Sequence, residues 1–305
     1  MSYLFLIIGL VVLAFGGDLL VKSAVSITKK LNVSPFLIGL TVVSFGTSFP
    51  ELLVSLQAAI DGNPGIAIGN VVGSNIANIG LVLGVTVLIS PMMIDRKKYV
   101  FSWLSMLLSA LLFIWFSVDL IISFYEGLCL IFLLIAFILF SIKFNKSEPL
   151  EVEDDEISSL PLILLYFVLG SIGLYFGADL LVQNAVIIAK NWGVSELVIG
   201  VTVIALGTSL PELATSSLAA IRGHNTISIG NLIGSNIFNV FAVVGITSAV
   251  KSIKVDASVL LFDFPVMLGI TLLLGVILLG SKINRLIGFG LLAIYLFYII
   301  YSFLI

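Results

Sequence analysis

The sequence predicts an all-α membrane protein in which ten transmembrane helices form two five-helix repeats of inverted topology. Three observations support this fold class. Of 305 residues, 60% are hydrophobic and 10% are charged, whereas roughly a quarter of the residues of a soluble protein are charged. About ten apolar stretches of roughly twenty residues follow one another, and each is long enough to cross a bilayer as a helix. The second half of the chain also repeats the first.

Each apolar stretch is expected to form one helix. The ten spans lie at residues 3–22, 35–60, 66–90, 99–118, 124–143, 160–183, 195–221, 226–250, 256–279 and 285–304. The first stretch follows no basic residue and carries no small-residue cleavage site, so we expect a retained helix and not a signal peptide. Cys129 is the single cysteine, which excludes an intrachain disulfide. The net charge of −3 indicates no nucleic-acid partner, and no obligate protein partner is evident.

Lysine and arginine are unevenly distributed among the loops. If the N-terminus lies outside, the internal loops hold Lys22, Lys29, Lys30, Arg96, Lys97, Lys98, Lys143, Lys146, Arg222, Lys282 and Arg285. Lys190, Lys251 and Lys254 then lie outside. Because cytoplasmic loops collect lysine and arginine, we expect both termini outside the membrane and the central loop in the cytoplasm.

The central loop is the longest hydrophilic segment. Its acidic residues are Glu148, Glu151, Glu153, Asp154, Asp155 and Glu156. We predict a solvated linker at residues 144–159, between a first five-helix repeat at 1–143 and a second, inverted repeat at 160–305. A regulatory calcium site is the alternative, but the loop lacks the glycine and the ligand spacing of a calcium-binding loop.

A shift of 161 positions relates the two halves. It places Asp18 on Asp179 and Glu51 on Glu212, and about 35 of the 63 positions from residue 16 to residue 78 are identical without a gap, which indicates an internal duplication. Because each half has an odd number of spans, the second half enters the membrane from the opposite side. Inverted repeats share a site near the middle of the membrane, and we expect Glu51 and Glu212 to meet there.

One motif occurs in each half, as Gly-Thr-Ser-Phe-Pro-Glu-Leu at residues 46–52 and Gly-Thr-Ser-Leu-Pro-Glu-Leu at residues 207–213. An ionisable side chain at membrane depth is costly and by default indicates function. The proline removes a backbone donor and frees carbonyl oxygens in the preceding turn. Hydroxyls, free carbonyls and a carboxylate are ligands of a hard cation. A structural proline kink with a hydroxyl patch is the alternative, but two copies with identical spacing favour an ion site.

A second shared motif follows each glutamate helix. Residues 69–78 and 230–239 both read Gly-Asn-x-x-Gly-Ser-Asn-Ile-x-Asn. Glycines four positions apart let helices approach closely, and the serine and the last asparagine, also four apart, share one helix face. We expect this polar face to meet the glutamate helix. A structural hydrogen-bonded seam is the alternative, chiefly for Asn70, Asn75, Asn231 and Asn236.

The paired G-T-S-x-P-E-L and G-S-N-I-x-N motifs, the 5+5 layout and the acidic loop resemble the cation/calcium exchanger superfamily, in particular its prokaryotic sodium/calcium exchanger branch. The resemblance covers essentially the whole chain. It implies a secondary antiporter, not an enzyme, that exchanges calcium for sodium by alternating access and uses no cofactor. Potassium-dependent relatives carry aspartate where this chain has Asn239, so the resemblance suggests potassium-independent exchange.

The resemblance also implies the ion ligands. Calcium would be bound by Glu51, Glu212 and the backbone oxygens of Thr47 and Thr208. Sodium would be bound by Glu51, Ala205, Thr208 and Ser209, and by Glu212, Ser44, Thr47 and Ser48. Ser74, Asn78, Ser235 and Asn239 would complete the central polar shell.

The charge of the two glutamates alone explains why two kinds of cation could be exchanged at one site. Their charge of −2 would be neutralised by one Ca²⁺ or two Na⁺, so the ions compete. An empty site would carry bare charge through a low dielectric, at a cost of several kcal/mol per ion. Three alternatives remain: a proton-coupled calcium antiporter whose glutamates are alternately protonated, an intramembrane hydrolase with paired carboxylates, and a channel.

The other charged residues have simpler interpretations. Asp18 and Asp179 lie in matching runs near the ends of their predicted spans, so we expect repeat-symmetric helix-end contacts. His224 is expected in a solvated turn, and Asp263 has no counterpart in the first repeat.

Overall fold

The computed structural model describes residues 1–144, 157, 159–193 and 207–302. Within these residues, nine helical segments are long and apolar enough to cross a membrane. The remaining predicted span, at 195–221, is described from Gly207 onward and contains α11 (Leu210–Ile221). Ala205 and the acidic residues of the predicted linker lie outside the described residues.

The first half contains five apolar spans, of which the second and third are composite. Its elements are α1 (Ser2–Leu31), α2 (Pro35–Ile38), η1 (Gly39–Val43), α3 (Ser44–Ile60), α4 (Pro64–Ala77), η2 (Asn78–Leu83), α5 (Gly84–Ile89), α6 (Arg96–Phe116) and α7 (Phe124–Phe144). The η segments are π-helical turns. Such turns are rare and often occur at functional sites.

The second half shows the same order where it is described. Its elements are α8 (Leu160–Asn191), α11, α12 (Asn225–Phe238), η4 (Asn239–Val244), α13 (Gly245–Val250), α14 (Ala257–Leu261), α15 (Asp263–Leu278) and α16 (Arg285–Ser302). The π-helical turns η2 and η4 begin at Asn78 and Asn239, the repeat-related ends of the second motif. The duplication therefore extends to this local distortion of the backbone.

Two short β-ladders confirm the inverted arrangement. β1 (Met92–Met93) pairs antiparallel with β4 (Lys282–Ile283), and β2 (Ile121–Ile122) pairs antiparallel with β3 (Ile253–Lys254). The residues of β1 and β2, shifted by 161 positions, are the residues of β3 and β4. The duplication therefore relates the β1–β4 ladder to the β2–β3 ladder. Helix α6 separates β1 from β2, so the ladders lie at opposite ends of a span. Repeat-related segments thus lie on opposite sides of the bundle.

Two predicted helix ends were wrong. Helix α1 continues to Leu31 and α8 to Asn191, well beyond the expected ends at residues 22 and 183. Polar side chains that follow the first apolar run bond to carbonyls of their own helix, as when Thr28 Oγ1 donates to the Ala24 carbonyl at 2.9 Å. The span expected at 256–279 is confirmed at Ala257–Leu278, but it breaks internally at Phe262, because Pro265 has no backbone N–H to donate to the Leu261 carbonyl.

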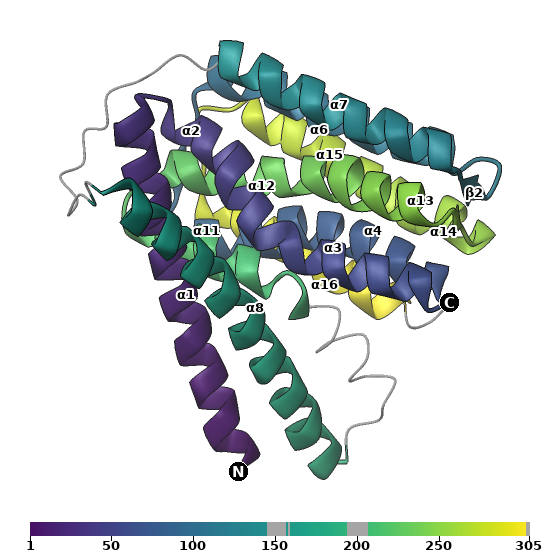
Figure 1. Cartoon of the computed structure of the whole chain (residues 1–305), viewed down its shortest axis with the longest axis horizontal. Helices are drawn as coiled ribbons and strands as arrows, with labels where there is room; N and C mark the ends of the chain where they lie inside the picture. The colour runs from purple at the N-terminus through teal and green to yellow at the C-terminus, as the bar shows by residue number, and fades with distance from the viewer. Residues whose placement is uncertain (145–156, 158, 194–206, 303–305) are drawn as a thin grey trace.

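Helices α1 and α8 lie side by side and run together away from the other helices (Figure 1). Their backbones approach closely at glycines: a Cβ added at Gly16 would lie 2.6 Å from the Leu174 nitrogen, and one at Gly177 would lie 2.5 Å from the Leu13 nitrogen. Small residues at such a crossing allow the van der Waals packing that holds helices together in lipid.

The helices that carry the second motif form the centre of the bundle. In the most apolar windows, 83% of the residues of span 225–250 and 72% of those of span 64–89 are buried, against 33% for α1 and 22% for α8. Helix α12 also packs directly against α2 and η1: a Cβ at Gly230 would lie 2.5 Å from the Phe36 carbonyl oxygen, and one at Gly234 would overlap the Leu40 carbonyl oxygen. The close approach expected at Gly230 and Gly234 is confirmed. The same expectation for Gly69 and Gly73 was wrong, because a Cβ at either position would meet nothing within 4 Å.

Candidate functional site

The first motif lies inside the continuous helix α3. Pro50 occupies the helix interior, and Glu51 is fully buried, with an exposed fraction of 0%. The Glu51 backbone oxygen accepts a hydrogen bond from Asn70 Nδ2 at 3.2 Å. Among the described residues, neither carboxylate oxygen of Glu51 has a hydrogen-bond partner. Glu51 therefore presents two free acceptors in the interior.

The second motif begins a helix instead of lying inside one. Thr208 and Ser209 form a turn, α11 starts at Leu210, and Glu212 lies in the first turn of α11. Glu212 is also fully buried. Its Oε1 accepts a hydrogen bond from Ser48 Oγ at 3.1 Å, whereas Oε2 has no partner in the described part of the chain.

The two glutamates belong to one site, as the sequence predicts. The Ser48 to Glu212 hydrogen bond joins α3, which carries Glu51, to α11, which carries Glu212. Neither forms an ion pair with a basic residue of the described chain. Two acidic groups with no basic partner in a low-dielectric interior are costly, which is the situation that a bound cation relieves.

Threonine and serine hydroxyls surround the glutamates in two repeat-related pairs. Thr47 Oγ1 lies 3.3 Å from Ser235 Oγ, and Thr208 Oγ1 lies 3.3 Å from Ser74 Oγ. Each pair joins the first motif of one repeat to the second motif of the other repeat. The expected contact between the polar face of the second motif and the glutamate helix is confirmed at both places.

Part of the second motif has a structural role. Asn70 Nδ2 donates to Ser55 Oγ at 2.9 Å, and Asn231 Nδ2 donates to Ser216 Oγ at the same distance. These bonds tie each asparagine to the helix that carries the preceding glutamate. The hydrogen-bonded seam considered as an alternative therefore exists at Asn70 and Asn231. The serine partners lie outside the two motifs, so the motifs alone do not predict them.

Asn239 and Asn75 form a further link across the repeats. Asn239 Nδ2 donates to Asn75 Oδ1 at 3.1 Å, and Asn75 Nδ2 donates to the Asn236 backbone oxygen at 3.4 Å. Asn239 Oδ1 and both polar atoms of Asn78 are buried and have no partner within the described residues. The asparagine pair at 78 and 239 thus retains free acceptors.

Several of the predicted ligands contribute unpartnered buried oxygens in the described chain. These are Oε1 and Oε2 of Glu51, Oε2 of Glu212, Oδ1 of Asn78 and Asn239, and Oγ of Ser209. Each buried polar group without a partner costs about 1–3 kcal/mol. The described residues contain no cluster of three or more His, Cys, Asp or Glu side chains. Carboxylate, hydroxyl and amide oxygens suit a hard cation such as Ca²⁺ and not a soft transition metal.

One predicted ligand is already engaged. Ser44 Oγ donates to the Gly39 carbonyl at 2.7 Å and lies 3.2 Å from the Asn231 carbonyl oxygen. Its hydroxyl therefore joins η1 to α12. The hydroxyl hydrogen is engaged, so a role in sodium binding would use an oxygen lone pair of Ser44. The repeat-related Ala205 lies outside the described residues.

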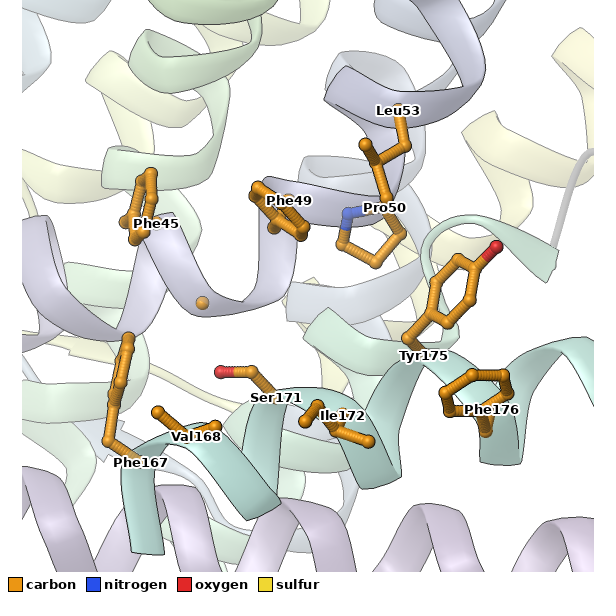
Figure 2. Close-up of a pocket in the computed structure, with 11 residues that line it drawn as sticks. Phe45, Phe49, Pro50, Leu53, Phe167, Val168, Ser171, Ile172, Tyr175 and Phe176 are labelled. Atoms are coloured by element: carbon orange, nitrogen blue, oxygen red, sulfur yellow. The ribbon is translucent and has the colours of Figure 1, made fainter. Parts of the chain in front are cut away.

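An apolar cavity of about 350 Å³ separates α3 from α8 (Figure 2). Phe45 and Phe49 border it on α3, and Phe167 and Ile172 border it on α8. Ser171 provides a buried hydroxyl that has no hydrogen-bond partner among the residues described. None of the lining residues is charged, so the cavity has no ligand for an ion.

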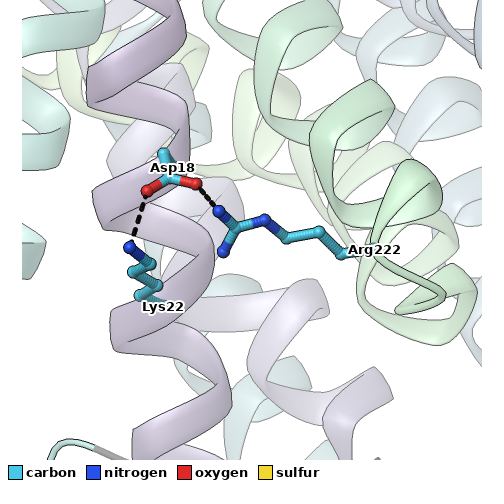
Figure 3. Close-up of polar contacts among 3 residues, drawn as sticks. All are labelled: Asp18, Lys22 and Arg222. Atoms are coloured by element: carbon cyan, nitrogen blue, oxygen red, sulfur yellow. Dashed lines mark hydrogen bonds and ion pairs between the residues drawn. The ribbon is translucent and has the colours of Figure 1, made fainter. Parts of the chain in front are cut away.

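The expectation of repeat-symmetric contacts at Asp18 and Asp179 was wrong. Both lie well inside long helices. Asp18 is ion-paired with Arg222 and, at 3.0 Å, with Lys22 (Figure 3). Asp179 instead accepts hydrogen bonds from Gln183. The difference arises because Lys22 corresponds to Gln183 in the second repeat.

Two other predictions concern single residues. His224 is buried, with an exposed fraction of 3%, so its expected placement in a solvated turn was wrong. It lies directly before α12.

Asp263 accepts a hydrogen bond from Tyr298 Oη at 2.8 Å. This contact lies on α15 and α16, away from the two motifs.

The chain has ten apolar spans in inverted repeats, and buried oxygen atoms from both halves lie at its centre. These features define an integral membrane transporter of cations. A family model described as sodium/calcium exchanger protein matches residues 1–143 and 162–304. The chain therefore belongs to the sodium/calcium exchanger family, and it is a transporter and not an enzyme.

Individual relatives agree with this assignment. The chain is 35% identical to the sodium/calcium exchanger MaX1 of Methanosarcina acetivorans, over 100% of this chain and 99% of the relative. It is 33% identical to the inner membrane protein YrbG of Escherichia coli, over 88% and 86%. The sodium-calcium exchanger NCX_Mj, in a structure soaked with zero Na⁺ and Ca²⁺, matches with a TM-score of 0.85 and 35% identity over 99% of this chain and 98% of that one. The predicted fold class is confirmed, and Ca²⁺ and Na⁺ are the transported ions of the family.

Proposed function

We propose that this protein exchanges Ca²⁺ for Na⁺ by alternating access, with the ions bound between Glu51 and Glu212. One observation carries the proposal: two fully buried glutamates come from opposite repeats whose helices are joined by the Ser48 to Glu212 hydrogen bond, and three of their four carboxylate oxygens have no partner within the described chain. A hard cation supplies the missing partner. The relative MaX1, named as a sodium/calcium exchanger, supports Na⁺ as the coupling ion.

The proposed ligands follow the repeat symmetry. Calcium is bound by the carboxylates of Glu51 and Glu212 and by the backbone oxygens of Thr47 and Thr208. Sodium is bound by two sets, namely Glu51, Ala205, Thr208 and Ser209, and Glu212, Ser44, Thr47 and Ser48. The side chains of Ser74, Asn78, Ser235 and Asn239 complete the polar surroundings.

Charge explains the coupling. Two carboxylates are neutralised by one Ca²⁺ or by two Na⁺, so both ions compete for the same oxygens. Moving the empty site across the membrane would expose uncompensated charge to a low dielectric, at a cost of several kcal/mol per ion. Reorientation therefore requires a loaded site, which makes the protein an exchanger and not a channel.

We also propose the membrane arrangement predicted from the sequence. Residues 1–143 form the first repeat, residues 144–159 an acidic cytoplasmic linker, and residues 160–305 the inverted second repeat, with both termini outside. The distribution of lysine and arginine supports this orientation. The name of the Escherichia coli relative, an inner membrane protein, supports a location in the prokaryotic inner membrane.

Flux in proteoliposomes tests the coupling ion. Vesicles loaded with Na⁺ and diluted into Na⁺-free medium with ⁴⁵Ca²⁺ should accumulate calcium, and vesicles without a Na⁺ gradient should not. A pH gradient as the sole driving force should give no uptake. Calcium uptake that follows the pH gradient and ignores Na⁺ would overturn the proposal in favour of proton coupling.

A further inference from the structure

A second cavity, of about 200 Å³, lies between α3, α8 and the start of α11. Pro50 borders it on α3, Tyr175 and Asp179 border it on α8, and Thr208 and Pro211 border it at the second motif. Pro50 and Pro211 are the residues that precede the two buried glutamates. The cavity therefore reaches from the exposed side chain of Asp179 to the motif that contains the proposed ion ligands.

The Asp179 carboxylate is held at this cavity by a neutral neighbour. Its two carboxylate oxygens accept hydrogen bonds from Gln183 Nε2 at 2.8 and 2.9 Å. Gln183 is neutral, and in the part of the chain that the structure describes no lysine or arginine forms an ion pair with Asp179. A single sign of charge at a cleft with low-dielectric walls focuses the electric field and raises the local concentration of the opposite ion.

The repeat-related carboxylate has a different environment. Asp18 is ion-paired with Lys22 of α1 and with Arg222 after α11 (Figure 3), so its charge is compensated. The two aspartates occupy equivalent positions in sequence, yet only Asp179 borders the described cavity and stays without a basic partner. The attraction for cations is therefore confined to one of the two repeat-related positions.

The inner end of the cavity leads to oxygen ligands. Thr208 borders the cavity and its hydroxyl lies 3.3 Å from Ser74 Oγ. Asp179 and Thr208 therefore border one cavity, and Glu212, which is fully buried, lies four residues beyond Thr208 in the chain.

We propose that Asp179 is a cation-recruiting residue at the mouth of the access route to the central site. The inference rests on the proposed function, because it assigns Asp179 a role in the supply of Ca²⁺ and Na⁺ to Glu51 and Glu212. Asp179 attracts the hydrated ion by its charge and does not bind it in the transported state. A divalent cation gains twice as much from this attraction as a monovalent one.

The test is the Ca²⁺ dependence of Na⁺-driven uptake by Asp179→Asn in proteoliposomes. We expect the half-saturating Ca²⁺ concentration to rise about threefold at low salt, with the maximal rate retained, since the lost attraction acts over roughly one Debye length. At an ionic strength of about 1 M, where the Debye length is about 3 Å, the difference should vanish. Asp179→Glu should behave as the wild type.

Asp61→Asn is the matched control. Asp61 is exposed and accepts a hydrogen bond from Gln57, four residues earlier, at 2.8 Å, but it does not border the cavity. Its substitution removes the same charge and should leave the half-saturating concentration unchanged.

Other outcomes overturn the inference. Wild-type Ca²⁺ dependence in Asp179→Asn would do so, as would a change that persists at 1 M salt or occurs equally in Asp179→Glu, because these results indicate packing and not charge. Asp179→Ser provides the same test if Asp179→Asn does not fold. Failure of the wild-type protein to transport Ca²⁺ against Na⁺ would instead reject the proposed function.

Discussion

The two copies of the seven-residue glutamate motif differ in conformation although their sequences are nearly identical. In the first copy, Thr47, Ser48 and Glu51 lie within the continuous helix α3, whereas in the second copy Thr208 and Ser209 form a turn before α11. The motif is therefore compatible with two backbone conformations, and its surroundings select between them. We expect the opposite-facing state to arise when the two copies exchange conformations.

The hydrogen bonds of the copies differ in the same way. Ser48 donates to Glu212 across the site at 3.1 Å. The repeat-related pair, Ser209 and Glu51, makes no such bond, and the oxygens of both side chains have no partner in the described residues. A second asymmetry is the Asp18 to Arg222 ion pair, because the sequence places Asp61 at the position equivalent to Arg222. This conformation is therefore held by contacts that have no repeat-related counterpart among the described residues.

The largest expected effect is the loss of either glutamate charge. Glu51→Gln and Glu212→Gln should each reduce Na⁺-driven calcium uptake by about a hundredfold or more, since the buried Ca²⁺ loses one carboxylate partner, breaking a buried ion pair costs about 3–5 kcal/mol, and 1.4 kcal/mol is a factor of ten. Both variants should insert and elute normally, because size is preserved. Glu126→Gln, at the start of α7, is the control and should transport normally. Normal transport by either site variant would remove that residue from the ligand set.

A smaller effect is expected from adding a charge at one repeat only. Asn239→Asp should change the ratio of the half-saturating Ca²⁺ and Na⁺ concentrations by about tenfold, since a Coulomb interaction over a few Å exceeds 1.4 kcal/mol. Asn78→Asp tests the equivalent position, and the exposed Asn63→Asp is the control. An unchanged ratio in Asn239→Asp would argue against a central position of this side chain.

The two motif serines should differ in their effect on stability. Ser48→Ala leaves Glu212 Oε1 without its donor and should lower the free energy of unfolding by about 1.5–3 kcal/mol in ion-free buffer, the value of a hydrogen bond to a charged group. Ser209→Ala removes a hydroxyl without a described partner and should be neutral. Thermal unfolding of the two variants measures the difference. Equal destabilisation would show that the two copies are equivalent in solution.

The smallest effect concerns the ion pair beside α1. Arg222→Gln should lower the free energy of unfolding by about 1 kcal/mol, because Arg222 and Asp18 are partly exposed, at 33% and 21%, and such pairs contribute little. Combining it with Asp18→Asn in a double-mutant cycle isolates the interaction. Lys97→Gln, in the first turn of α6, is the control. Additive effects of the two substitutions would mean that the ion pair does not stabilise this state.

Most of the fold could be predicted from the sequence. Long apolar stretches fix the spans because the bilayer requires about twenty apolar residues, and the identity between halves fixes the repeats. The true ends of α1 and α8 were missed because Thr28 on α1 and Asn184 on α8 bond to carbonyls of their own helix and so do not interrupt it.

The convergence of the glutamates could also be predicted, but the asymmetry of the site could not. Ser48 and Ser209 occupy identical sequence positions, so no local pattern distinguishes the bonded serine from the unbonded one. The ion pair of Asp18 depends on Arg222, which is distant in sequence and has no basic counterpart in the first repeat. A comparison of Lys22 with Gln183 would have indicated that Asp18 and Asp179 differ.

Joint binding of the transported calcium ion by Glu51 and Glu212 can be seen by anomalous diffraction from crystals of this protein soaked with Ca²⁺ and then with Na⁺ in excess. We expect a calcium peak between the two carboxylates that Na⁺ displaces. A calcium peak elsewhere in the protein, or one between the glutamates that persists in excess Na⁺, would show that the two glutamates do not form the exchange site.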